Sequence, residues 1–229
     1  MTQTIVAFDI AELEQATALL DEFPEPIYIK IGMENFYSLG NEFIKLAKAR
    51  GHRIFLDLKL HDIPNTVSHA MAQLAKLQVD MINVHASGGI DMMKAAVQVV
   101  KANNPACLCI AVTMLTSLND SDAKETLGLS KSIFATTLHY AKNAQRAGMD
   151  GVVCSVHEVA AIHEQCGHDF VCVTPGIQYG AAVALDQKRI ATPSQARDAG
   201  ANYIVVGRSI TQSAKPYETY QLIEKELHA

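Results

Sequence analysis

The chain alternates eight times between a short run rich in β-branched residues and a longer stretch whose apolar residues recur at helical spacing. The predicted strands span residues 4–9, 28–33, 54–60, 81–86, 107–115, 151–156, 170–177 and 203–210. Strands that alternate with helices pair in parallel through right-handed crossovers. Eight such units within 229 residues predict an α/β fold, a single (β/α)8 TIM barrel, with one domain over residues 1–229.

An open, doubly wound sheet is the alternative fold for this alternation. Dinucleotide-binding sheets of that kind carry G-x-G-x-x-G after the first strand, and this chain has Ala7-Phe8-Asp9-Ile10 there. Helix ends are predicted at Gly51, Gly148, Gly167 and Gly200, and a helix start at Pro193 after Thr192.

The first predicted helix spans residues 12–23 and the last spans 216–227. Only two connections, 116–130 and 178–189, are predicted to be long and non-helical. Long loops in a compact domain usually bind ligands or cover a site. We therefore expect these two segments to act as lids.

Composition excludes several classes of function. The net charge is −5 and no run of lysine or arginine occurs, which argues against nucleic-acid and membrane-surface partners. No apolar run reaches the roughly 18–20 residues of a membrane span, and the N-terminus does not resemble a signal peptide. The five cysteines are an odd number and lie mostly in apolar strands. We expect reduced, buried thiols and a cytoplasmic location.

Two charges interrupt the apolar strand predicted at 54–60. Asp57 and Lys59 are two residues apart, so their side chains share one face. A structural ion pair is the simplest interpretation. Asp9 and Lys30 end two other predicted strands, however, and the carboxyl ends of barrel strands meet at one mouth. An array of alternating charges there, with Asp62 just beyond, indicates a site tuned for proton transfer.

The ends of the seventh and eighth predicted strands carry Pro175-Gly176 and Gly207-Arg208. The loops after these two strands often form the phosphate site of a barrel. Glycine lets a backbone N–H approach the phosphate, and arginine supplies a bidentate donor. A metal site is not predicted, because His61 beside Asp62 has no second histidine at ligand spacing.

Taken together, these segments resemble the orotidine 5′-phosphate decarboxylase family in its bacterial form, over essentially the whole chain. The strongest match is Asp57-Leu58-Lys59-Leu60-His61-Asp62-Ile63-Pro64-Asn65-Thr66. Further matches are Ala7-Phe8-Asp9, Lys30-Ile31-Gly32-Met33-Glu34, Asn83-Val84-His85-Ala86-Ser87-Gly88-Gly89, Val112-Thr113-Met114-Leu115-Thr116-Ser117, Val173-Thr174-Pro175-Gly176-Ile177 and Val206-Gly207-Arg208.

The resemblance implies decarboxylation of orotidine 5′-phosphate to uridine 5′-phosphate without a cofactor. It implies that Lys59 protonates C6 of the pyrimidine, that Asp57 lies beside the substrate carboxylate, and that Lys30 and Asp62 complete the charge array. Its remaining implied contacts are Asp9 and Lys30 with the ribose, Thr116 near the base, and Gln187, Gly207 and Arg208 with the phosphate. It further implies a homodimer in which Asp62, Ile63 and Thr66 reach the neighbouring subunit's site.

The chain departs from the family pattern at two positions. Gln178 stands where arginine is expected, and Ser209 stands where proline is expected. A charged hydrogen bond contributes roughly 1.5–3 kcal/mol against about 1 for a neutral one, so we expect weaker phosphate binding, with Arg208 carrying most of it. Lys188 and Arg189 are close enough in sequence to compensate.

Two rival functions remain at this point. One is a magnesium-dependent sugar-phosphate decarboxylase or synthase of the same superfamily, which would need acidic metal ligands at strand ends, in particular where Lys30 stands. The other is a catalytically silent nucleotide-binding barrel. The complete set of Asp9, Lys30, Asp57, Lys59 and Asp62 argues against the silent barrel.

Overall fold

The computed structural model describes residues 1–180 and 188–229. Its strands are β1 (Gln3–Ala7), β2 (Tyr28–Gly32), β3 (Arg53–Leu60), β4 (Met81–His85), β5 (Leu108–Val112), β6 (Gly151–Val153), β7 (Val171–Thr174) and β8 (Tyr203–Val206). They close into a barrel in chain order, and each neighbouring pair, including β8 with β1, is parallel. The predicted (β/α)8 barrel is confirmed.

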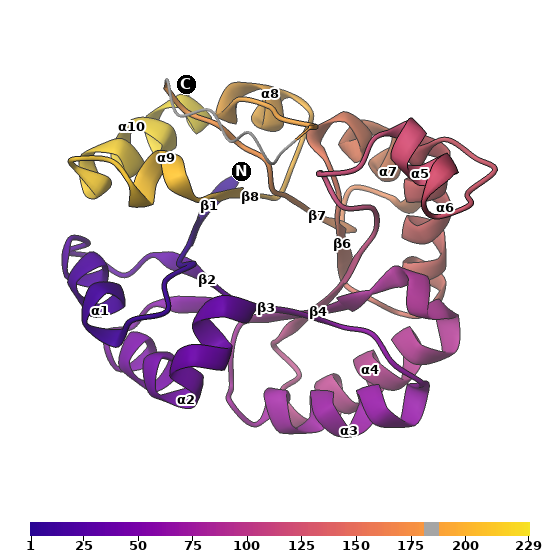
Figure 1. Cartoon of the computed structure of the whole chain (residues 1–229), viewed down its shortest axis with the longest axis horizontal. Helices are drawn as coiled ribbons and strands as arrows, with labels where there is room; N and C mark the ends of the chain where they lie inside the picture. The colour runs from indigo at the N-terminus through magenta and orange to yellow at the C-terminus, as the bar shows by residue number, and fades with distance from the viewer. Residues whose placement is uncertain (181–187) are drawn as a thin grey trace.

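The helices surround the ring of strands on its outside (Figure 1). They are α1 (Leu13–Asp21), α2 (Met33–Ala49), α3 (Pro64–Ala75), α4 (Gly89–Asn103), α5 (Asp120–Glu125), α6 (Ile133–Arg146), α7 (Val159–Cys166), α8 (Pro193–Asp198), α9 (Arg208–Thr211) and α10 (Pro216–Leu227), with 3-10 turns η1 (Ala86–Gly88) and η2 (Val156–Glu158). The four predicted helix-ending glycines all have φ between 82° and 87°, a conformation that favours glycine. Thr192 caps α8 ahead of Pro193, as predicted.

Several predicted boundaries are wrong. Strands β5, β6, β7 and β8 end three or four residues earlier than predicted, because the apolar residues that follow belong to other structures. Ile210, for example, is buried as part of α9. The connection 116–130 is not wholly non-helical, since it contains α5, which Asn119 and Asp122 start with a reciprocal capping box.

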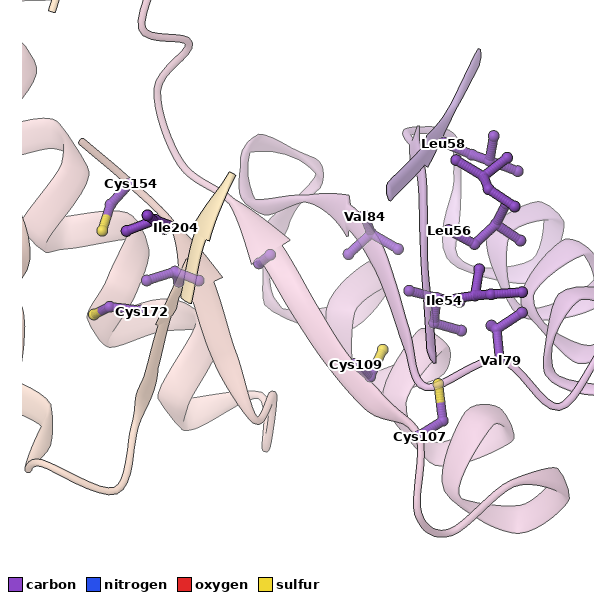
Figure 2. Packing of buried hydrophobic residues seen from close by; sticks show 14 of the residues in the cluster. Ile54, Leu56, Leu58, Val79, Val84, Cys107, Cys109, Cys154, Cys172 and Ile204 are labelled. Atoms are coloured by element: carbon purple, nitrogen blue, oxygen red, sulfur yellow. The ribbon is translucent and has the colours of Figure 1, made fainter. Parts of the chain in front are cut away.

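Apolar side chains form an inner and an outer layer. Inside the barrel, Phe55, Met81, Ile110 and Val173 are buried against one another. The outer layer joins the strands to the helices. Figure 2 shows part of it, including Cys107 just before β5, Cys109 of β5, Ile54 of β3 and Val84 of β4.

All five cysteines are free and buried, as predicted. Burial raises the pKa of the Cys107 thiol to about 12, so this thiol stays protonated at neutral pH. Across residues 1–180 and 188–229, none of the helices combines the length and apolar character required to cross a bilayer.

Candidate active site

A cavity of about 620 Å³ lies at the carboxyl ends of the strands, where a barrel of this kind carries its site. The predicted site residues that line it are Asp9, Lys30, Asp57, Lys59, Thr116, Pro175, Gln178, Gly207 and Arg208. They come from strands or loops spread around the barrel, so the fold brings together residues that are as much as 199 positions apart (208 − 9). The cavity volume falls in the range of small-molecule sites.

Four charges alternate along one wall of this cavity. Lys59 Nζ lies 2.7 Å from Asp57 Oδ1, and Lys30 Nζ lies 3.6 Å from Asp57 Oδ2. Lys30 Nζ also lies 2.8 Å from Asp9 Oδ1. The buried Asp57 carboxylate is therefore held between two ammonium groups, which offset its loss of hydration.

Charge and burial have opposite effects on these groups. Burial by itself would raise the pKa of Asp57, but the Lys30 and Lys59 ammonium groups, with hydrogen bonds from Lys59 and Asn83, hold it below its usual range. Burial by itself would lower the pKa of Lys30, but the Asp57 and Asp9 carboxylates raise it above its usual range. Asp57 is thus an anion and Lys30 a cation at neutral pH.

Lys59 has an unusual backbone conformation for a residue near the end of a strand. Its φ is 54°, and a non-glycine residue in a sparsely populated region of this kind costs on the order of 1–3 kcal/mol. The pairing of β3 with β4 shifts register between Leu56 and Leu60, the interval that contains Lys59. Strain concentrated at one charged residue of a cavity is typical of a functional position.

Asn83 is a site residue that the sequence did not single out. Its Oδ1 accepts a hydrogen bond from the Lys59 backbone N–H at 2.8 Å, and its Nδ2 donates to Asp57 Oδ1 at 2.6 Å. The available signal was an asparagine inside the apolar strand β4. Such a residue must find hydrogen-bond partners when it is buried.

The loops after β7 and β8 also line the cavity. Arg208 lies there with Gly207, Gln178 and Ser209. The Ser209 hydroxyl accepts the Tyr179 backbone N–H at 3.1 Å, so it links the two loops in a way that proline could not. Gln178 Nε2 is buried without a hydrogen-bond partner in the described part of the protein, which leaves a donor for a ligand oxygen.

Lys188 and Arg189 are each held in an ion pair away from the cavity, so the structure gives no support to the prediction that they compensate for Gln178. Lys188 Nζ pairs with Asp122 Oδ2 at 2.7 Å. Arg189 pairs with Glu158 and donates to the Met114 carbonyl at 3.1 Å. Both cations are held by the β5–α6 segment and η2, and neither lines the cavity.

Among the described residues, three predicted site residues do not line this cavity. Asp62, Ile63 and Thr66 are exposed at the start of α3, and the Ile63 side chain is 65% exposed. Their predicted role in a neighbouring subunit stays a prediction. Gln187 lies outside the described residues.

The fold and the cavity define the class of protein: a (β/α)8-barrel enzyme whose site combines a lysine–aspartate array with a Gly-Arg turn. The family described as "Orotidine 5'-phosphate decarboxylase / HUMPS family" matches residues 2–223. The chain belongs to this family, and it is a decarboxylase, an enzyme of the carboxy-lyase class.

Individual relatives agree with this assignment. An orotidine 5′-phosphate decarboxylase of Streptococcus suis is 49% identical over 227 residues, covering 98% of this chain and 97% of the relative. One from Bacillus cereus is 47% identical over 227 residues, covering 97% and 95%. The crystal structure of orotidine 5′-phosphate decarboxylase from Lactobacillus acidophilus has a TM-score of 0.90 and 39% identity, covering all of both chains. An uncharacterized conserved protein from Geobacillus kaustophilus has a TM-score of 0.87 and 41% identity, covering 98% and 99%.

Proposed function

We propose that this chain converts orotidine 5′-phosphate to uridine 5′-phosphate and carbon dioxide, the last step of de novo pyrimidine nucleotide synthesis. The observation that carries the proposal is the Asp9–Lys30–Asp57–Lys59 array in one cavity with Arg208. The names of the relatives support the choice of substrate. The chain would act as one domain, residues 1–229, and its buried thiols support a cytoplasmic location.

The reaction breaks the bond between C6 of the pyrimidine and its carboxylate. The electron pair of that bond stays on C6 as carbon dioxide leaves, and C6 then takes a proton from the Lys59 ammonium. The neutral Lys59 amine afterwards regains a proton from water. In this scheme Asp57 lies beside the departing carboxylate, and Lys30 keeps Asp57 ionised.

The Lys59 ammonium stabilises the developing negative charge on C6. At about 4 Å and an effective dielectric constant of about 20, this attraction is on the order of 4 kcal/mol, or roughly a thousandfold in rate. This contribution alone is too small for so difficult a decarboxylation. The rest would come from the preorganised array, whose charges need no reorientation during the reaction, and from substrate binding remote from C6.

Binding remote from C6 would use the rest of the cavity. Asp9 and Lys30 would contact the ribose, and Thr116 would lie near the base. The phosphate would be held by Arg208, with Pro175, Gln178, Gln187 and Gly207 as its further contacts. Gln178 can donate through its Nε2, which has no hydrogen-bond partner among residues 1–180 and 188–229, a neutral hydrogen bond in place of the charged one that arginine would give.

We also propose a homodimer with shared sites, to which Asp62, Ile63 and Thr66 contribute across the interface. The exposure of these residues next to β3 supports this assembly. Mixing Lys59→Ala and Asp62→Ala proteins after separate purification tests it, because a mixed dimer would hold one site with both native residues. We expect the mixture to regain activity that neither variant has. Activity that stays at the level of the separate variants would contradict shared sites.

We expect the activity to survive EDTA. A magnesium-dependent sugar-phosphate enzyme would need an acidic ligand where this chain has Lys30, whose ammonium would repel a divalent cation. Turnover is measured after EDTA treatment and again after adding Mg²⁺. Activity that is lost with EDTA and restored by Mg²⁺ would favour the magnesium-dependent rival.

Loss of the orotate-ring absorbance on mixing substrate with the purified protein separates the proposed enzyme from a silent nucleotide-binding barrel. The proposal requires the absorbance to fall with repeated turnover. A protein that binds uridine 5′-phosphate but leaves the absorbance of the substrate unchanged would be the silent barrel.

A further inference from the structure

An interruption in the β-ladder lies beside the charge array. The pairing of β3 with β4 runs from Leu56 opposite Ile82 to Leu60 opposite Val84, so β3 contains extra residues across this interval. Lys59 lies within it, at a φ of 54°. Because the chain bulges here, the Lys59 backbone N–H is donated to a side chain, that of Asn83.

Asn83 occupies the point on β4 that faces this bulge. It is only 1% exposed, and its single planar amide makes two contacts. Its Oδ1 accepts from the Lys59 N–H at 2.8 Å, and its Nδ2 donates to Asp57 Oδ1 at 2.6 Å. The same Asp57 oxygen accepts a hydrogen bond from the Lys59 ammonium at 2.7 Å. One side chain therefore fixes both the backbone of the lysine and its carboxylate partner.

We propose that Asn83 is a positioning residue for the decarboxylation, holding Lys59 and Asp57 in the relative geometry that proton transfer to C6 requires. The inference rests on the proposed function. Asn83 does not line the cavity, so it acts through the other two residues rather than on the substrate. A lysine at positive φ persists only when its surroundings hold it there, and Asn83 is the neighbour that binds this backbone N–H.

The test compares variants of two buried asparagines. Asn83→Leu keeps the number and branching of the side-chain heavy atoms and removes both hydrogen bonds, and Asn83→Ala serves as a smaller second variant. Asn104→Leu is the matched control, since Asn104 is also buried and donates to a backbone carbonyl, that of Val79 ahead of β4, away from the cavity. The measurements are kcat and KM for orotidine 5′-phosphate, the Kd of uridine 5′-phosphate, and the thermal unfolding midpoint.

We expect kcat to fall roughly a hundredfold in both Asn83 variants, the size of effect that a misplacement of about 1 Å produces. The Kd of uridine 5′-phosphate should change less than about threefold, because the loss is confined to the transition state. Asn104→Leu should lose thermal stability and keep its kcat.

Four results would overturn the positioning role. The first is a kcat in a folded Asn83 variant within about threefold of the parent. The second is an equal loss of kcat and of uridine 5′-phosphate affinity. The third is failure of both Asn83 variants to fold while Asn104→Leu folds. The fourth is an inactive parent protein, which would overturn the proposed function and this inference together, whereas the first three leave the proposed function intact.

Discussion

Lys59→Ala is expected to lower kcat for orotidine 5′-phosphate by at least about a thousandfold, the rate equivalent of the attraction between its ammonium and the charge developing on C6. The fold should survive this substitution. Alanine and lysine both carry a Cβ, which makes a positive φ unfavourable to a similar degree. The substitution should therefore not change the cost of the backbone conformation at position 59. Asp57 keeps the Lys30 ammonium at 3.6 Å and the hydrogen bond from Asn83.

The measurement is single-turnover kinetics at saturating enzyme, with circular dichroism and uridine 5′-phosphate binding as checks on the fold. Lys215→Ala is the control, since it removes an exposed lysine that pairs with Glu218 and does not line the cavity. A Lys59→Ala protein within about tenfold of the parent rate would rule out Lys59 as the proton donor.

Arg208→Ala is expected to weaken the binding of uridine 5′-phosphate roughly a hundredfold, because a charge-assisted hydrogen bond to phosphate contributes up to about 3 kcal/mol. Gln178 beside it brings no charge, and Lys188 and Arg189 are held by Asp122 and Glu158. Lys188 and Arg189 would therefore have to break these ion pairs before they could bind the phosphate in place of Arg208.

Calorimetric titration with uridine 5′-phosphate and with uridine separates the phosphate contact from the rest of the site. Uridine, which has no phosphate, should bind the parent and Arg208→Ala with equal affinity. The affinity of Arg208→Lys for uridine 5′-phosphate should lie between those of the parent and Arg208→Ala, since lysine keeps the charge and loses the bidentate geometry of arginine. An unchanged affinity for uridine 5′-phosphate, or an equal loss for uridine, would remove Arg208 from the phosphate site.

The sequence predicted the order of the elements much better than their ends. The last helix, Pro216–Leu227, matches the prediction, because Pro216 is a good first residue and a regular apolar stripe follows. The eighth strand was predicted four residues too long, since Ile210 continues its apolar run. Burial of Ile210 within α9 satisfies the same pattern, and periodicity does not separate a short strand from a short helix.

The charge array was predictable because barrel topology alone places strand ends at one mouth. Contacts made by loop residues could not be predicted in this way. Lys188 and Arg189 looked available for phosphate, but their partners, Asp122 and Glu158, lie far away in sequence. The positive φ of Lys59 and its bond to Asn83 arise from the register of β3 against β4, which no local pattern encodes.

Turnover in D2O tests directly whether C6 of the substrate loses carbon dioxide and takes up a proton that has exchanged with solvent. The Lys59 ammonium exchanges its hydrogens with solvent before each turnover, so the proton delivered to C6 is a deuteron. We expect the parent protein to convert orotidine 5′-phosphate to uridine 5′-phosphate that carries deuterium at C6, so that the NMR spectrum of the product lacks the C6 proton signal. Recovery of unchanged substrate, or of product that carries only protium at C6, would contradict this expectation.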